Sequence, residues 1–114
     1  MKRWCEPNEA IKMEIKVSVI VPVYKVESFI SRCVQTLMEQ SLTEVEYIFV
    51  DDASPDSSIT ILRNMLVEYP ERSNYVKILI HSENKGLPVA RNTGLAVACG
   101  EYIFHCDSDD FVEP

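Results

Sequence analysis

Four short runs of β-branched and aromatic residues alternate with amphipathic stretches along this chain, and no other feature of the sequence constrains its fold as strongly. The runs cover residues 17 to 23, 45 to 50, 75 to 80 and 101 to 106. Strands that alternate with helical patterns imply a mainly parallel sheet with right-handed crossovers and helices on both faces. We therefore expect an open α/β fold with four strands and three helices.

The first two intervals between these runs carry clear helix signals. Apolar residues recur at spacings of three and four between Phe29 and Met38, which places them on one stripe of a helix. Residues 54 to 56 offer a cap and a first-turn proline for a second helix, whose apolar stripe extends to Tyr69.

The third interval differs because the residues that should face the sheet are small. The helix should begin near Pro88 and end at Gly100. Ala90 and Gly94 would face the sheet, and their small side chains permit close packing of the helix on the strands.

Composition supports one folded unit preceded by a polar segment. The chain has 114 residues, of which 46% are apolar, and this suffices for a single core. Residues 1 to 16 are polar and lack a clear period, so we expect a polar leader there. The folded portion should cover residues 17 to 114.

Charge, hydropathy and cysteine spacing exclude several classes of protein. The 18 acidic and 11 basic residues give a net charge of -7, so the chain lacks the basic face that nucleic acid requires. Its apolar stretches are far shorter than the roughly 20 residues of a membrane span. The four cysteines show no CxxC spacing, which favours reduced thiols. We expect no nucleic-acid partner, no transmembrane segment, and a location in the cytoplasm or peripherally at the inner face of a membrane.

The aspartates are concentrated at two places, after the second run and after the fourth. They are Asp51, Asp52 and Asp56, then Asp107, Asp109 and Asp110. Because the carboxyl ends of parallel strands share one edge of a sheet, both groups should meet in the crevice where open α/β sheets bind ligands. Turn and cap chemistry also accounts for single aspartates, and for Asp56 we favour that explanation.

The step from Asp107 through Ser108 to Asp109 has the chemistry of a hard-cation site. In extended backbone, residues i and i+2 point to the same side and would give two oxygen ligands. Mg²⁺ and Mn²⁺ prefer such ligands, and substrate phosphates and water usually complete their coordination. The pattern therefore predicts both a divalent metal and a phosphorylated ligand.

Other phosphate-handling motifs do not fit the sequence. A P-loop needs GxxxxGK[ST] and a dinucleotide fold needs GxGxxG, but the only glycines are Gly86, Gly94 and Gly100. A haloacid dehalogenase phosphatase would need DxDx[TV], and Phe111 occupies the last position of that pattern here. These three classes are excluded or poorly matched.

Four motifs in order resemble the family 2 glycosyltransferases of the GT-A fold. They are VSVIVPVY at 17 to 24, VDDAS at 50 to 54, NKG at 84 to 86 with ARNTG at 90 to 94, and GEY at 100 to 102 leading to DSDD at 107 to 110. The resemblance covers about residues 15 to 114. An ordered set of motifs is far more specific than any one member.

The resemblance implies a nucleotide-sugar donor, usually UDP-linked, and direct displacement with inversion at the anomeric carbon. Pro22 and Tyr24 match the segment that lines the nucleobase, where the Tyr24 ring could stack on uracil. Asp52 matches the aspartate that accepts from the base N3–H, with Asp51 supporting the turn beside it. Arg91 matches a basic residue near the nucleotide and the diphosphate.

The same resemblance assigns the metal site. Asp107 and Asp109 match the outer positions of the family's DxD motif. Asp109 is the expected metal ligand, and Asp107 would bind the ribose or help to hold the ion. The metal, Mn²⁺ or Mg²⁺, would act as a Lewis acid that neutralises charge on the departing diphosphate.

The family's catalytic base lies well beyond the DxD motif, whereas this sequence stops at Pro114. We therefore expect a truncated chain that carries the donor and metal half of a transferase, has no catalytic base of its own, and shows little or no transfer alone. The acceptor hydroxyl, on an unknown saccharide or lipid, is not specified by these residues.

Other interpretations remain open. A non-enzymatic, receiver-like α/β signalling module has a similar length and alternation, but it needs an acidic pair where residues 22 to 24 stand. A truncated product that folds poorly, because one edge of its sheet is exposed, is a further alternative. His81, after the third run, could approach a diphosphate, although a strand-end histidine satisfied by its neighbours is the more common case. For Lys85 a solvated loop charge is the better explanation.

Overall fold

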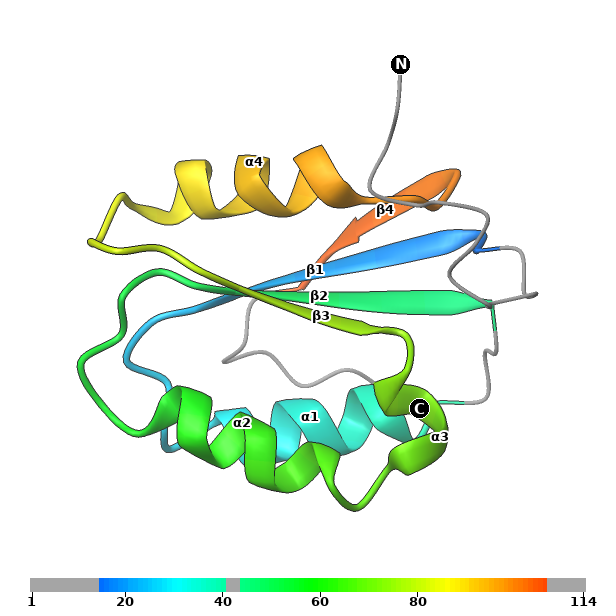
Figure 1. Cartoon of the computed structure of the whole chain (residues 1–114), viewed down its shortest axis with the longest axis horizontal. Coiled ribbons are helices and arrows are strands. Elements are labelled where there is room, and N and C mark those ends of the chain that lie inside the picture. Colours follow the sequence, from blue (N-terminus) through cyan, green and yellow to red (C-terminus); the bar gives the residue numbers. More distant parts are fainter. Residues whose placement is uncertain (1–14, 41–43, 107–114) are drawn as a thin grey trace.

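The computed structural model describes residues 15–40 and 44–106 and contains one sheet with helices on both faces (Figure 1). The elements are β1 (Val17–Val23), α1 (Ile30–Met38), β2 (Val45–Asp51), α2 (Ser58–Leu66), α3 (Pro70–Ser73), β3 (Val76–Ile80), α4 (Leu87–Val97) and β4 (Tyr102–His105). The four predicted strands are therefore confirmed, each within a residue or two of the expected bounds.

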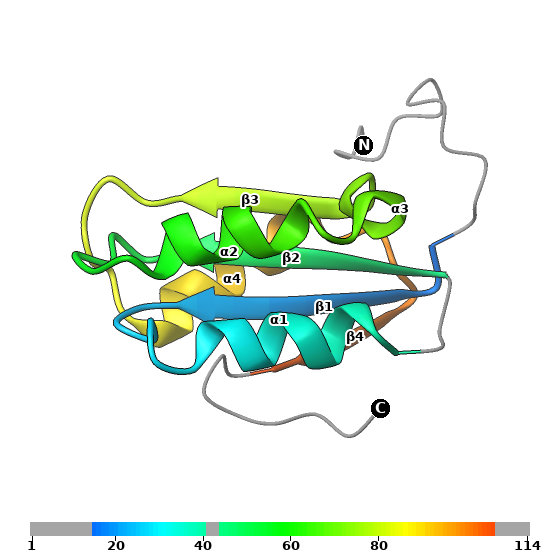
Figure 2. The same ribbon diagram turned by 90° about the horizontal axis from the view of Figure 1, so that it is seen from below.

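The sheet is parallel throughout and has the strand order β3-β2-β1-β4. The chain steps outward from β1 through β2 to β3, and α4 then carries it back across the sheet to β4 on the other side of β1. In Figure 1, α4 lies above the sheet, and α1 and α2 lie below it; Figure 2 shows α1 and α2 side by side. The predicted open α/β fold is confirmed.

Both central strands are buried on their two faces, so the core has two halves. From β1 and β2, Val21 and Phe49 belong to the larger half, which packs against α1 and α2. Ile20 and Ile48, one position earlier on each strand, belong to the smaller half under α4. Side chains of a strand alternate between faces, so a strand covered on both sides needs an apolar residue at nearly every position. This explains why the strand runs were continuous rather than alternating.

The close packing expected of the last helix is present at Gly94. A Cβ atom built on Gly94 would lie 2.6 Å from Cγ2 of Ile20 and 3.4 Å from Cγ2 of Val50. Ala90, one turn earlier, is fully buried in the same half of the core. Small residues therefore set the distance between α4 and the sheet.

Within residues 15–40 and 44–106 the structure has four helices instead of the expected three. A single helix was predicted up to Tyr69, but α2 ends at Leu66 and Tyr69 precedes the short helix α3. Pro70 explains the break, because the residue before a proline is disfavoured in helical backbone. Tyr69 accordingly has φ -129° and ψ 61°.

The start of α2 and the end of α4 also differ from the prediction. Residues 54 to 56 precede α2, whose first helical residue is Ser58. Helix α4 ends at Val97, and Gly100 lies beyond it against β1, where an added Cβ would come within 2.7 Å of the Ser18 nitrogen. Gly100 therefore permits the close approach of two backbone segments and does not cap the helix.

A buried ion pair holds the connection between α4 and β4. Glu46, with 4% of its side chain exposed, lies 3.0 Å from the Lys77 ammonium. Its carboxylate also accepts from the Ser18 hydroxyl at 2.6 Å and from the Cys99 N–H at 2.5 Å. The Gly100 N–H donates to the Ser18 hydroxyl oxygen at 2.8 Å. A buried carboxylate is tolerated only when its acceptor positions are filled in this way.

The cysteines depart in part from the expectation of reduced thiols. Cys33 and Cys106 are buried and form no disulfide bond, as expected of small apolar residues. Cys99 is disulfide-bonded. It lies in the connection between α4 and β4.

Two expectations concern the chain as a whole. In the ranges that the structure describes, no helix is long and apolar enough to cross a membrane. The leader predicted for residues 1 to 16 lies almost entirely outside these ranges and stays a prediction, as does the boundary of the folded portion.

We predict that Gly94→Ala destabilises the chain by up to about 2 kcal/mol. Alanine should gain about 1 kcal/mol of helix propensity, but the overlap with Ile20 should cost about 1–3 kcal/mol. The free energy of unfolding from urea titration measures the difference. Asn92→Ala, at an exposed position of the same helix, is the control and should leave stability equal or slightly raised. A Gly94→Ala variant more stable than the wild type would contradict the close contact.

Candidate functional site

The topology brings the ends of all four strands to one edge of the sheet. Tyr24 follows β1, Asp52 follows β2 and His81 follows β3 at this carboxyl edge. The strand order reverses at β1, since β2 and β4 lie on its two sides and are reached in opposite directions. Open α/β sheets bind ligands outside the carboxyl ends of their strands at such a reversal. The edge beside β1 is therefore the candidate site.

The structure places Pro22 and Tyr24 at the end of β1. Pro22 is buried within the strand, beyond Ile20, the last residue of β1 that pairs with β4. Tyr24 is 39% exposed, and the Lys25 ammonium lies 5.4 Å from the centre of its ring. An exposed aromatic ring next to a cation can contact a flat, electron-rich ligand such as a nucleobase.

The loop that carries Tyr24 is tied to the loop after β2 by backbone-to-side-chain hydrogen bonds. The Lys25 N–H donates to the Ser54 hydroxyl at 2.8 Å, and the Val26 N–H donates to the Ser58 hydroxyl at 3.0 Å. In the other direction, the Ser57 N–H donates to the Glu27 carboxylate at 2.9 Å. These bonds fix the two loops relative to each other.

Two residues of these loops have left-handed backbone. Lys25 has φ 55° and Ala53 has φ 59°, values that cost a non-glycine residue roughly 1–2 kcal/mol. The side chain of Asp51 stabilises the second turn, because its Oδ1 accepts from the Ser54 N–H at 2.9 Å. This agrees with the supporting role expected for Asp51.

Asp56 acts as a structural acceptor rather than as a ligand. One carboxylate oxygen accepts from the Ser54 hydroxyl at 2.6 Å and from the Ser58 hydroxyl and N–H at 2.7 and 3.0 Å. Burial works to raise the pKa of Asp56, but the hydrogen bonds from Ser54, Ser58 and the Glu27 N–H outweigh it and lower the pKa to about 2. The preference for turn and cap chemistry at Asp56 is confirmed, although the residue precedes α2 instead of lying in its first turn.

Asp52 is the centre of a second network at this edge. Its Oδ1 lies 2.8 Å from Nδ1 of His81 and accepts from the Lys85 N–H at 2.9 Å, while its Oδ2 accepts from the Gly86 N–H at 2.9 Å. Burial works to raise the pKa of Asp52, but these hydrogen bonds, that from His81 foremost, lower it below its ordinary value. The carboxylate therefore stays ionised at neutral pH.

Both ring nitrogens of His81 have hydrogen-bond partners within the chain, as is common for a histidine at the end of a strand. Besides Asp52, its ring contacts the Thr93 hydroxyl, 2.8 Å from Nε2. Lys85 is exposed, in agreement with a solvated charge, but its backbone has the structural role just described. No local pattern predicts that Thr93 and Gly86 join Asp52 in one network, because these contacts span 12 to 34 residues.

Of the remaining predicted residues, the structure describes Arg91 but not the aspartates after β4. Arg91 is partly buried on α4, whose N-terminal end follows the loop that Asp52 holds. Asp107, Asp109 and Asp110 lie outside the described residues, directly after the segment that ends at Cys106. In the part of the chain that is described, no group of three or more His, Cys, Asp or Glu side chains could hold a metal ion.

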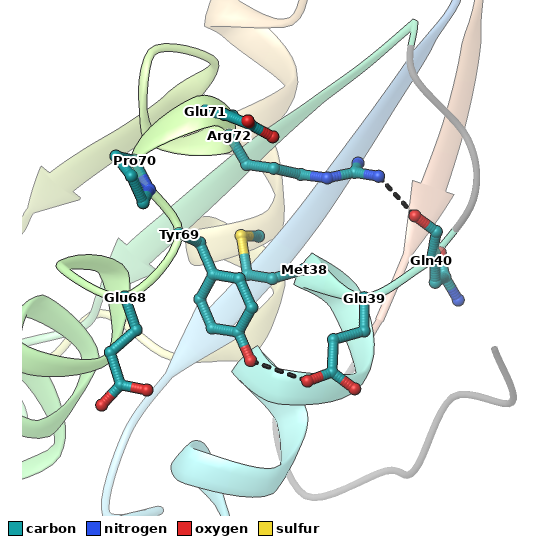
Figure 3. Close-up of a pocket in the computed structure, with 8 residues that line it drawn as sticks. All are labelled: Met38, Glu39, Gln40, Glu68, Tyr69, Pro70, Glu71 and Arg72. Atoms are coloured by element: carbon teal, nitrogen blue, oxygen red, sulfur yellow. Dashed lines mark hydrogen bonds between the residues drawn. The ribbon is translucent and has the colours of Figure 1, made fainter.

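A pocket of about 480 Å³ lies elsewhere, where α1 and α2 end (Figure 3). Its lining residues are Met38, Glu39, Gln40, Glu68, Tyr69, Pro70, Glu71 and Arg72. The Tyr69 hydroxyl donates to Glu39 at 2.9 Å, and Arg72 donates to the Gln40 carbonyl. None of the predicted nucleotide-binding residues lines it, and its three glutamates would repel a diphosphate. We therefore place the candidate site at the carboxyl edge.

Comparison with known families agrees with the motifs at this edge. A family model described as glycosyl transferase family 2 matches residues 18–114. The chain belongs to this family. The matched range contains the first motif from its second residue onward and the other three motifs in full, including the aspartates that lie outside the described residues.

Individual relatives of this family 2 chain are much longer. The uncharacterized glycosyltransferase EpsJ of Bacillus subtilis is 44% identical over 96 residues, which cover 84% of this chain and 26% of EpsJ. The chain thus spans about a quarter of the length of this curated relative.

Solved structures of glycosyltransferases share the fold. Residues 1–349 of TarS from S. aureus, in complex with UDP-GlcNAc, superpose with a TM-score of 0.76 at 34% identity, over 87% of this chain and 28% of that one. The mannosyltransferase PcManGT from Pyrobaculum calidifontis, in complex with GDP-Man and Mn²⁺, gives a TM-score of 0.80 at 27% identity, over 88% and 29%. The GT-A fold expected from the motifs is confirmed.

We predict that Asp56 makes the stability of this family 2 chain depend on acid pH. Its pKa is lowered from 3.8 to about 2 on folding, so its contribution is fully present above pH 3.8 and is lost as the pH falls through about 2. The free energy of unfolding of the wild type and of Asp56→Asn should therefore converge between pH 4 and pH 2. The effect should be modest because the carboxylate is partly exposed to solvent.

The control for this prediction is Glu71→Gln, an exposed carboxylate at the distant pocket. Its stability should run parallel to that of the wild type over the same pH range. A constant difference between wild type and Asp56→Asn from pH 5 to pH 2 would contradict the hydrogen-bonded state of Asp56.

Proposed function

We propose that this chain is the nucleotide-sugar-binding part of a glycosyltransferase and that its donor is UDP-linked. The observation that carries the proposal is the convergence of Tyr24 and Asp52 at the carboxyl edge, beside the reversal of strand order at β1. Family membership supports it, as do the solved relatives described in complex with UDP-GlcNAc and with GDP-Man and Mn²⁺.

The nucleobase would lie against Tyr24 and Pro22, with Asp52 reading its edge. Oδ1 of Asp52 already has two partners, whereas Oδ2 accepts one hydrogen bond from the described residues. A carboxylate oxygen has two acceptor positions, so Oδ2 retains one for a donor such as the uracil N3–H. Cytosine presents an acceptor at the same place and would be disfavoured.

The diphosphate and the metal would lie closer to α4 and to the segment after β4. Arg91 would supply a fixed positive charge for the diphosphate. Asp109 would ligate Mn²⁺ or Mg²⁺, and Asp107 would bind the ribose or share the metal, since carboxylate oxygens suit these ions. When bound, the metal would neutralise charge on the leaving diphosphate.

The reaction of the whole enzyme would be an inverting displacement by an acceptor hydroxyl of a saccharide or lipid. We place no catalytic base among the residues of this chain. A cytoplasmic location, or a peripheral one at the inner face of a membrane, stays a prediction. The receiver-like signalling module loses its support because the family match covers the same residues.

We predict saturable binding of UDP that requires Mn²⁺. Isothermal titration of the 114-residue chain with UDP, with and without Mn²⁺, measures it. Asp109→Asn should weaken binding in Mn²⁺ by at least about tenfold, because a carboxylate ligand of the metal is lost.

Glu113→Gln removes one charge from the same segment and is the matched control, with affinity close to that of the wild type. Circular dichroism with a melting curve establishes that each variant folds. Absence of UDP binding by a wild-type chain that melts cooperatively would overturn the proposed function.

A further inference from the structure

The ring of His81 bridges two elements at the candidate site. Nδ1 lies 2.8 Å from Oδ1 of Asp52, just after β2, and Nε2 lies 2.8 Å from the Thr93 hydroxyl on α4. Only 9% of the His81 side chain and 4% of the Asp52 side chain are exposed. The main chain of His81 is fixed too, because its N–H donates to the Asp51 carbonyl at 2.8 Å. The ring is therefore held from both sides and has little freedom to turn.

The two nitrogens of His81 have different partners, and this fixes one proton. Asp52 is ionised at neutral pH and can only accept, so Nδ1 of His81 carries the hydrogen of that bond. The Thr93 hydroxyl has another acceptor within reach, the Val89 carbonyl at 3.0 Å. The contact at Nε2 can therefore be made in more than one way, whereas the contact at Nδ1 has a single direction.

The orientation of Asp52 also determines where α4 begins. Its carboxylate accepts from the N–H groups of Lys85 and Gly86, immediately before Leu87. Gly86 adopts φ 96°, a left-handed value that a glycine reaches without strain. The carboxylate thus has three donors, and rotation of its plane would break these hydrogen bonds.

We propose that His81 is a positioning residue for the nucleotide, and this inference rests on the proposed function. Its Nδ1–H fixes the plane of the Asp52 carboxylate so that the open acceptor position of Oδ2 points to the base. The Nε2 contact with Thr93 only secures the ring. Asp52 reads the uracil edge, and His81 sets the geometry in which it does so.

Two substitutions separate the nitrogens of His81. The side-chain amide nitrogen of His81→Asn lies close to the position of Nδ1, so this variant keeps a donor for Asp52. That of His81→Gln reaches the position of Nε2 and keeps the contact with Thr93 while losing the donor for Asp52. Thr93→Val removes the Nε2 partner at nearly constant shape.

The experiment is isothermal titration of UDP in Mn²⁺ into the wild type and the three variants. His81→Gln should bind at least about tenfold more weakly, as expected when a hydrogen bond to a charged group is lost. His81→Asn and Thr93→Val should stay within about threefold of the wild type. Melting curves measured in parallel report any loss of folding.

A purely structural role for His81 predicts a different result. Affinity would then follow the melting temperature, and His81→Asn and His81→Gln would weaken binding in proportion to their stability. Equal affinities for these two variants, whether high or low, would overturn the inference while UDP binding by the wild type upheld the proposed function.

A readout without nucleotide keeps the two proposals distinguishable. If the wild type does not bind UDP, the proposed function fails, and the amide proton resonances of Lys85 and Gly86 test the positioning of Asp52 by NMR. These resonances should move in His81→Gln and stay near their wild-type positions in His81→Asn. Unchanged resonances in both variants would overturn the role of His81.

Discussion

Burial of β1 and β2 on both faces is the constraint on which the rest of this structure depends. Helices α1 and α2 cover one face of these strands and α4 covers the other. A shift of one residue in either strand would exchange the two halves of the core, so the register is firmly specified. Polar side chains are therefore rare within β1 and β2. Ser18 and Glu46 are tolerated in these strands because they form a hydrogen bond with each other. Glu46 also forms an ion pair with Lys77.

This constraint moves the chemistry to the ends of the strands. At the carboxyl edge, the loops after β1 and β2 exchange hydrogen bonds, one of them from the left-handed residue Lys25. The turn at the left-handed residue Ala53 is closed by the hydrogen bond from the Ser54 N–H to Asp51. Asp52 connects the end of β2 to the start of α4 through backbone donors. The edge is therefore organised before any ligand arrives, which reduces the entropy that binding would cost.

Much of the fold could be predicted from the sequence because the strand signals are local. Continuous apolar runs marked β1 and β2, and the small residues Ala90 and Gly94 marked the close approach of α4. The break before α3 was missed, since the apolar stripe continues to Tyr69 and hides the effect of Pro70 on the backbone before it. Gly100 was taken for a helix end, but its contact is with Ser18, 82 residues away in the chain.

The sequence by itself determined the order of the elements, the parallel sheet and the edge at which the aspartates after β2 lie, because all of these follow from local periodicity and the direction of parallel strands. Only the tertiary structure decided which groups contact which at that edge. It joined Asp56 to the Glu27 N–H of the loop after β1, and it surrounded Asp52 with His81, Lys85 and Gly86. Such partners come from segments about 30 residues apart, and no short-range pattern encodes a hydrogen bond that exists only after both faces of the sheet have been covered.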